Sequence, residues 1–217
     1  MLSAVLFDFS DTLFWRNGGE RSRVLLADSG VDADVSVLAQ TWNDVKAASG
    51  TAQELAKRRD CSAEAHRRCW VELLQPFNAY HPSAALMMYG DQPNPVGWEP
   101  FPETVEVLHA VARARLPIGV VSDIGWDLRP IFEHHGVAHF VDTWVLSYEH
   151  GTEKPDPRMF ELGCAGLGSL PHQTLMVGDS VEKDAGAAKA GLTALTLPAY
   201  SGSGERGLRR ALRLLDL

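Results

Sequence analysis

The sequence predicts an α/β protein with a doubly wound, mostly parallel, Rossmann-like sheet and an inserted α-helical domain. Short apolar runs without polar alternation recur along the chain, which is typical of strands that are covered on both faces. Segments with helical spacing lie between the later runs, as in a repeated strand–helix fold. A long stretch after the first run contains helix-like segments and no strand-like run, which indicates a helical insertion.

Four apolar runs have the length of buried strands. They are residues 4–7, 118–121, 175–177 and 194–197. Helical spacing of apolar residues predicts helices over residues 103–115, 157–166 and 182–189. Asp156 and Pro157 suit the N-cap and the first residue of the second helix. Strands and helices in this order favour a parallel sheet with helices on both faces.

The helix-like stretch defines the domain organisation that we expect. Residues 1–14 and 102–217 would form the α/β core, and residues 15–101 would form a helical cap domain between its first and second strands. Residues 80–102 are rich in Pro, Gly and Asn, and we expect them to return irregularly to the core.

The C-terminal part is predicted to form a connector followed by a helix. Residues 201–204, Ser-Gly-Ser-Gly, predict a flexible connector. The basic amphipathic segment after it carries Leu208, Leu212 and Leu215 on one side. Docking of this helix on the core is favoured over contact with a partner or a membrane surface.

Composition excludes several function classes. A net charge of −8 argues against binding to nucleic-acid backbones. No apolar run approaches the roughly 20 residues that cross a bilayer, and the N-terminus lacks a basic region of a signal peptide. The three cysteines form no C-x-x-C pair, so we expect reduced thiols and a cytoplasmic protein. No pattern in the sequence predicts an oligomeric state.

Polar residues follow three of the predicted strands at the point where each ends. Asp8 follows the first, Ser122 and Asp123 end the second, and Asp179 follows the third. Any one of these could be a helix cap or a turn residue. Because open α/β sheets bind ligands at the carboxyl ends of their strands, the three together predict a functional site there.

These residues stand in four motifs that resemble, in order and separation, those of the haloacid dehalogenase (HAD) superfamily. VLFDFSDTLF has Asp8 at the nucleophile position, and VVSDIG has Ser122. GTEKPDPRMF supplies Lys154, and VGDSVEKDAGAAKAG supplies Asp179 and Asp184. The resemblance spans nearly the whole chain, and the helical insertion is similar to a cap domain that follows the first motif.

The resemblance implies a Mg2+-dependent hydrolase, most simply a phosphatase of a small phosphorylated metabolite that forms an aspartyl-phosphate on Asp8. It implies Mg2+ ligands from the carboxylates of Asp8 and Asp179 and from the backbone carbonyl of Ser10, with Asp184 acting directly or through water. Mg2+ prefers such oxygen ligands, and a carboxylate fixed beside a metal can attack phosphorus without prior deprotonation.

Two further residues receive roles from the resemblance. Ser122 would hydrogen-bond an oxygen of the transferred phosphoryl group. Lys154 would neutralise charge on Asp8 and on that group, which otherwise repel each other. Lys154 precedes Pro-Asp-Pro at a predicted helix start, which favours this role over that of a solvated loop lysine.

Ser10 departs from the pattern of the family's phosphatases, which carry a second aspartate there as the general acid and base. A serine hydroxyl cannot take that role near neutral pH. Asp11 is the nearest carboxylate; it could reach the leaving group or bind a backbone amide of the turn. Otherwise the leaving group needs little protonation, the substrate or a cap residue supplies the proton, or activity is low or absent.

Two alternative functions therefore stay open. Metal-free 2-haloacid dehalogenases of the superfamily also lack the second aspartate and attack carbon; Asp179 and Asp184 argue against this alternative. The second alternative is a binding or regulatory protein that has the fold of the family and no catalytic activity.

The cap sequence says less about the substrate. Trp15 and Arg16 could line the mouth of the site, and Trp98 and Trp126 could wall the pocket or pack in the core. Four arginines of the cap are expected to be solvated on helix faces. They are Arg58, Arg59, Arg67 and Arg68.

Overall fold

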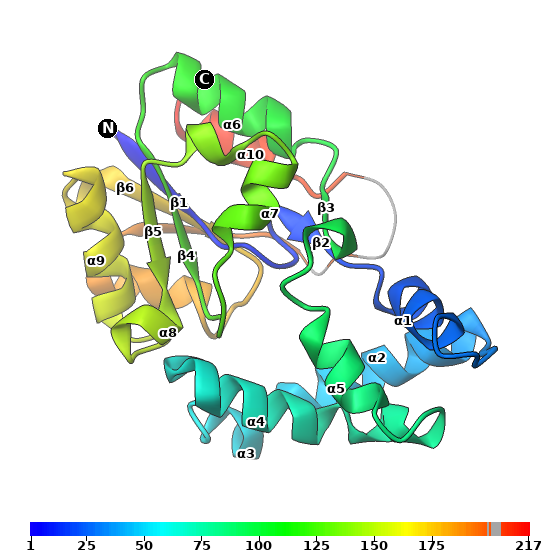
Figure 1. Ribbon diagram of the computed structural model, residues 1–217. Coiled ribbons are helices and arrows are strands. Elements are labelled where there is room, and N and C mark those ends of the chain that lie inside the picture. The colour runs from blue at the N-terminus through cyan, green and yellow to red at the C-terminus, as the bar shows by residue number, and fades with distance from the viewer. Residues whose placement is uncertain (199, 201–204) are drawn as a thin grey trace.

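A five-stranded parallel sheet forms the centre of the protein, and its strands run in the order β5-β4-β1-β6-β7 (Figure 1). The computed structural model describes residues 1–198, 200 and 205–217. The strands are β1 (Ala4–Phe7), β4 (Ile118–Ser122), β5 (Thr143–Leu146), β6 (Thr174–Gly178) and β7 (Thr193–Thr196). This architecture confirms the predicted α/β class. Because β1 lies between β4 and β6, the strand order reverses at β1, where open α/β sheets bind their ligands.

Helices cover both faces of the sheet, so its central strands are apolar without alternation. Val5 and Phe7 of β1 pack in one cluster with α6 (Thr104–Arg113), α7 (Arg129–His134) and α10 (Arg209–Leu214). Leu6 packs in a second cluster with α9 (Pro157–Leu167) and the 3-10 helix η6 (Asp184–Ala190). All three side chains are fully buried, and each such burial contributes about 2 kcal/mol to stability.

The C-terminal helix docks on the core, as expected. Leu208 and Leu215 are buried in the same cluster as α6. Arg209 of α10 forms an ion pair with Glu106 of α6 at 2.6 Å. The predicted flexible connector, residues 201–204, lies outside the described residues.

Five α-helices lie between the first and second strands of the sheet. They are α1 (Gly18–Ala27), α2 (Val35–Ser49), α3 (Ala52–Leu55), α4 (Ala63–Leu73) and α5 (Ala84–Gly90). We call residues 18–90 the helical insert. It has its own apolar cluster, which includes Leu38 and Phe77, and it lies on the side of the sheet where the strands end (Figure 1). Antiparallel strands β2 (Phe14–Trp15) and β3 (Glu99–Pro100) lead out to it and back. The domain boundaries at residues 15 and 101 stay a prediction.

Three local predictions need correction. Residues 80–102 are not wholly irregular, because α5 forms there, with the N–H of Ala85 donating to the Asn78 side chain at 2.8 Å. The predicted helix over 182–189 is the 3-10 helix η6, which ends at Gly191 with a φ of 86°. The last strand begins at Thr193, one residue before the predicted start, and β5, whose first residues are only half-buried, was not predicted. None of the described helices is long and apolar enough to span a membrane.

Candidate active site

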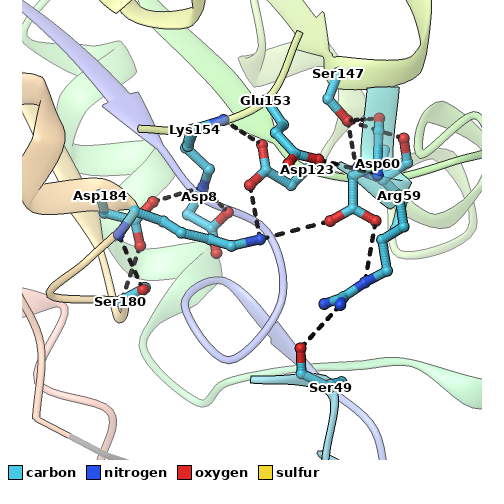
Figure 2. Close-up of polar contacts among 12 residues, drawn as sticks. Asp8, Ser49, Arg59, Asp60, Asp123, Ser147, Glu153, Lys154, Ser180 and Asp184 are labelled. Carbon is cyan, nitrogen blue, oxygen red and sulfur yellow. Dashed lines mark hydrogen bonds and ion pairs between the residues drawn. The ribbon is translucent and has the colours of Figure 1, made fainter. Parts of the chain in front are cut away.

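Three carboxylates and one lysine meet at the carboxyl ends of β1 and β6. Asp8 follows β1, Asp179 follows β6 and Asp184 begins η6, and one oxygen from each lies within 4.8 Å of the others. The Nζ of Lys154 donates to Oδ1 of Asp8 at 2.6 Å and to Oδ1 of Asp184 at 2.5 Å (Figure 2). We call these four residues the acidic cluster. The structure thus brings together residues that are up to 176 positions apart in the sequence (184 − 8).

Asp184 is held at the strand end by the loop that follows β6. Its Oδ2 accepts the backbone N–H groups of Asp179 at 3.0 Å and of Ser180 at 2.9 Å (Figure 2). A Cβ on Gly178 would lie 2.2 Å from the carboxylate carbon of Asp184, so only glycine lets this side chain approach the strand. The Val-Gly-Asp-Ser sequence therefore determines both the turn and the place of the carboxylate.

Lys154 is fixed from two sides. Its ammonium group is buried between two carboxylates, and its backbone N–H donates to Oδ1 of Asp123 at 2.8 Å. Oδ2 of Asp123 in turn contacts the Nζ of Lys183 at 2.9 Å. The loop after α8 (Ser147–His150) is thereby tied to the end of β4.

Burial dominates the electrostatics of the cluster. It raises the pKa of Asp8 to about 8; the Lys154 ammonium opposes this shift, and the carboxylates of Asp184 and Asp179 add to it. Burial also raises the pKa of Asp179 to about 6, with contributions from the Asp184 and Asp11 carboxylates. Burial alone would lower the pKa of Lys154, but Asp184 and Asp8 raise it well above its ordinary value.

The charge balance suits a divalent cation. With all three carboxylates ionised, the cluster of three acids and one ammonium group would carry an excess of two negative charges (3 − 1) at a largely buried place. Oxygen ligands of this kind are those that hard divalent cations bind in proteins. Asp8, Asp179 and Asp184 could therefore hold one such ion.

We expect the metal-free protein to lose stability as the pH rises. The folded-state pKa values of Asp179 and Asp8, about 6 and about 8, lie above the ordinary value of 3.8. Between about pH 4 and pH 8 these two groups bind more protons in the folded protein than in the unfolded chain, so they lower the free energy of unfolding as the pH rises. The His66 imidazole, whose pKa burial lowers to about 3, opposes this change below about pH 6.5, so the fall should be clearest between about pH 6.5 and pH 8. Melting temperatures measured in excess EDTA should show the fall, and Mg2+ should offset it.

Asp8→Asn provides the matched control for this pH series, because it removes one of the two titrating groups with little change of shape. Its melting temperature should depend less on pH than that of the wild type. A wild-type melting temperature that rises from about pH 6.5 to pH 8 in EDTA would contradict the assigned pKa directions.

The other predicted site residues lie around the cluster. Ser122 is the last residue of β4, next to β1 in the sheet, and is buried. Ser10 and Asp11 are in the turn after β1, where Asp11 has a φ of 56°. The Asp11 carboxylate forms an ion pair with Lys46 of α2 at 2.9 Å, and its backbone carbonyl accepts a hydrogen bond from Arg206. The carboxylate of Asp11 is thus directed to the helical insert.

A cavity of about 850 Å³ lies between the helical insert and the strand ends. Ser10, Asp11 and Asp179 are among the residues that line it. Trp15 and Arg16 line it as well, which agrees with the expectation from the sequence. Trp98 and Trp126 combine the two roles that were considered, because they are buried in the core cluster and also face the cavity.

One arginine of the insert does not behave as predicted. Arg58, Arg67 and Arg68 are exposed, but Arg59 is 6% exposed and lines the cavity. Its Nη1 donates to the carbonyl of Ser49 at 2.8 Å, and its guanidinium lies 5.3 Å from the ring centre of Trp70. The 3-10 helix η1 (Arg59–Cys61) turns it inward, which no helical spacing could indicate.

The next residue, Asp60, joins the insert to the core. Its carbonyl accepts a hydrogen bond from Oγ of Ser147 at 2.6 Å, and its N–H donates to Glu153 at 3.0 Å (Figure 2). Its carboxylate lies 3.5 Å from Nζ of Lys183. Nearby, a Cβ on Gly125 would lie 2.3 Å from the ring of His66, so the core loop approaches α4 closely. Sequence reasoning missed these contacts because their partners come from distant segments without a shared motif.

Family membership follows from a comparison with known protein families. The model of the haloacid dehalogenase-like hydrolases matches residues 2–191. The chain therefore belongs to this family, and the protein is a hydrolase.

Individual relatives agree with this assignment. A glyceraldehyde 3-phosphate phosphatase from Methanopyrus kandleri is 26% identical over 208 residues, which are 91% of this chain and 84% of the relative. A HAD phosphatase from Thermococcus onnurineus has a similar structure, with a TM-score of 0.64, 18% identity and coverage of 99% and 98%. L-2-haloacid dehalogenase from Xanthobacter autotrophicus gives a TM-score of 0.67, 19% identity and coverage of 100% and 83%. These two structural likenesses establish the fold alone.

Proposed function

We propose that this hydrolase cleaves phosphate monoesters of small molecules, with Mg2+ as cofactor and a covalent aspartyl-phosphate on Asp8. The observation that carries the proposal is the acidic cluster, in which a strand-end carboxylate meets two further carboxylates and a buried lysine. The name of the relative from Methanopyrus kandleri, a phosphatase, supports this choice.

The chain offers a suitable set of metal ligands. Asp8, Asp179 and Asp184 would hold Mg2+ together with the backbone carbonyl of Ser10, which lies in the turn directly after Asp8. When bound, Mg2+ supplies positive charge to the Asp8 carboxylate and to the phosphoryl oxygens. The raised pKa values of Asp8 and Asp179 fit this role, because a bound cation would favour the ionised form of both groups, above all of Asp8, whose pKa is about 8.

The residues of the chain divide the reaction into two displacements. An oxygen of Asp8 attacks phosphorus, and the bond from phosphorus to the leaving-group oxygen breaks. Lys154 holds Asp8 in place and neutralises charge, while Ser122 would donate a hydrogen bond to a phosphoryl oxygen. Water then attacks the acyl phosphate, which releases inorganic phosphate and restores Asp8. The helical insert over the strand ends would exclude water from the first displacement.

The proposal is tested by turnover of p-nitrophenyl phosphate and acetyl phosphate with Mg2+ and with excess EDTA. We expect release of inorganic phosphate in Mg2+ only. Chloride release from 2-chloropropionate that persists in EDTA would instead establish the dehalogenase function. Absence of both activities from a folded protein that still binds Mg2+ would identify a non-catalytic member of the family.

Ser10→Asp should raise the turnover of alkyl phosphates. The substitution places a carboxyl group two residues after Asp8, where it can protonate an alkoxide that otherwise leaves as a strong base. General acid catalysis typically contributes about 100-fold or more, so we expect a gain of that order with ethyl phosphate and a smaller gain with acetyl phosphate. Ser10→Asn is the matched control, since it has similar size without an acidic proton. Equal gains from both variants would show that acid catalysis is not what the wild type lacks.

The cellular compartment is also part of the proposal. Cys61, Cys69 and Cys164 are unpaired thiols, and two of them are buried. This state supports a reducing compartment and so a cytoplasmic protein.

A further inference from the structure

We propose that the substrate is an aryl phosphate. Its leaving group is a phenol that carries no charged substituent, and its ring binds against the tryptophans of the cavity. This inference rests on the proposed phosphatase function and names its substrate class. Three features of the cavity lead to it: its aromatic wall, the pairing of its charged side chains and the lack of a group placed to protonate a strongly basic leaving group.

The aromatic wall is concentrated in this one cavity. Five of the six tryptophans of the chain line it, together with Ser10 and Asp179. They are Trp15, Trp42, Trp70, Trp98 and Trp126. Trp98 and Trp126 come from the core side, with ring centres 6.1 Å apart, whereas Trp42 and Trp70 come from the helical insert. A cavity lined by indole rings from both parts of the chain favours an aromatic ligand.

The charged side chains of the cavity leave little attraction for a second charged group of the substrate. Each described cation that lines the cavity contacts a carboxylate. The pairs are Arg16 with Asp91, Lys46 with Asp11 at 2.9 Å, Lys183 with Asp123 at 2.9 Å and Arg59 with Asp60 at 3.7 Å. A charged leaving group would have to break one of these pairs, so the cavity favours an uncharged one.

Two side chains in the turn after Asp8 are not placed as proton donors. The Ser10 hydroxyl is not acidic near neutral pH. The Asp11 carboxylate contacts Lys46 of α2 at 2.9 Å and is directed to the helical insert. Neither is therefore placed to supply a proton to a leaving alkoxide.

The cavity's histidine does not replace them. Burial lowers the pKa of His66 to about 3, and Arg59 and Lys183 add to this effect. The imidazole is therefore neutral at physiological pH, and its Nδ1 is engaged with the Tyr89 hydroxyl at 3.1 Å. A leaving group in this cavity has to depart as an anion, which phenols do far more readily than alcohols because a phenol has a pKa of about 10.

The reaction balances without an enzyme acid. An Asp8 oxygen forms a bond to phosphorus, and the electron pair of the breaking P–O bond stays on the phenolate oxygen. Phenolate takes a proton from water. A second water attacks the aspartyl-phosphate, its proton passes to solvent, and the net products are phenol and inorganic phosphate. Stacking on indole rings would hold the ring during the first displacement.

Four substrates separate the two parts of the inference. Phenyl phosphate has a ring and an acidic leaving group, benzyl phosphate only the ring, acetyl phosphate only the acidic leaving group, and ethyl phosphate neither. We expect kcat to increase with the acidity of the leaving group, so that phenyl phosphate is hydrolysed at least about 100-fold faster than benzyl phosphate. We expect KM to follow the ring, about tenfold lower for phenyl and benzyl phosphate than for the other two.

Binding without turnover provides an independent measurement. Calorimetry should show phenylphosphonate, which cannot be hydrolysed, binding about tenfold more tightly than methylphosphonate. Trp70→Leu should reduce this preference. Trp144→Leu is the matched control, because Trp144 on β5 packs against Phe132 with ring centres 4.7 Å apart and does not line the cavity. Trp126→Phe keeps an aromatic ring in the cavity and should retain the preference.

Each negative result has a distinct meaning. If acetyl phosphate is hydrolysed but phenyl phosphate is no faster than benzyl phosphate, or the ring gives no gain in binding, the inference is wrong and the phosphatase function stands. If a folded, Mg2+-binding protein hydrolyses none of the four esters, both are wrong. Faster turnover of an anionic alkyl ester, such as phosphoglycolate, than of phenyl phosphate would also overturn the inference.

Discussion

Asp8→Asn is expected to lower the turnover of phosphate esters by about 10³-fold or more, because the amide cannot form the covalent intermediate. The substitution keeps the size of the side chain and removes a carboxyl group whose pKa is raised by burial. The variant should therefore fold and should be no less stable than the wild type in EDTA at about pH 8. Release of inorganic phosphate from acetyl phosphate is the measurement, with the melting temperature alongside.

Asp127→Asn is the control for this experiment. Asp127 is an exposed carboxylate that pairs with Arg129 at 2.9 Å outside the cavity, so the variant should keep wild-type turnover. Mass spectrometry of acid-quenched wild type should find a phosphoryl group on Asp8. A folded Asp8→Asn variant with wild-type turnover would exclude Asp8 as the nucleophile.

Lys154→Met is expected to have the second largest effect, on stability as well as on activity. The ammonium group of Lys154 is the cation between Asp8 and Asp184, and all three side chains are buried. Removing it leaves two carboxylates uncompensated, and loss of one partner of a buried ion pair typically costs about 3–5 kcal/mol. Urea unfolding in EDTA at about pH 8 should show a destabilisation of this order, and Mg2+ should restore part of it.

A control lysine separates this effect from a general loss of charge. Lys189 is exposed on η6, so Lys189→Met should leave both the unfolding midpoint and turnover unchanged. A stable Lys154→Met variant with wild-type activity would mean that the contacts of Lys154 with Asp8 and Asp184 have no role in folding or catalysis. A pH series gives a further check, since the destabilisation should shrink as the pH falls toward about 4 and uncompensated carboxylates take up protons.

The central sheet was predictable because its signal is local. Three or four apolar residues in a row, such as those before Asp8 and before Gly178-Asp179, are typical of a strand that is covered on both faces. The edge strand β5 was not predicted; its polar first residue Thr143 and the following Trp144 are only half-buried, so it lacks the full burial of the central strands. The 3-10 form of η6 and the helix α5 depend on packing and on side-chain contacts that a propensity cannot supply.

The candidate site also contains contacts that the sequence could predict and contacts that it could not. Asp8, Asp179, Asp184 and Lys154 stand in local motifs, and parallel strands bring their ends to one edge, so their proximity could be expected from the sequence. Asp60 and Lys183 approach each other to 3.5 Å from segments 123 residues apart (183 − 60), and neither stands in a motif that points to the other.

The sequence alone thus determined the class of fold and the place of a strand-end carboxylate, Asp8, since both follow from short apolar runs and from the residues directly after them; the resemblance of four motifs indicated the family. Only the tertiary structure decided what surrounds that carboxylate. It buried Asp8 deeply enough to raise its pKa to about 8, directed Asp11 to Lys46 and gathered tryptophans from the insert and the core around one cavity. The physical reason is that burial, charge pairing and cavity shape depend on the packing of distant segments, which no local pattern records.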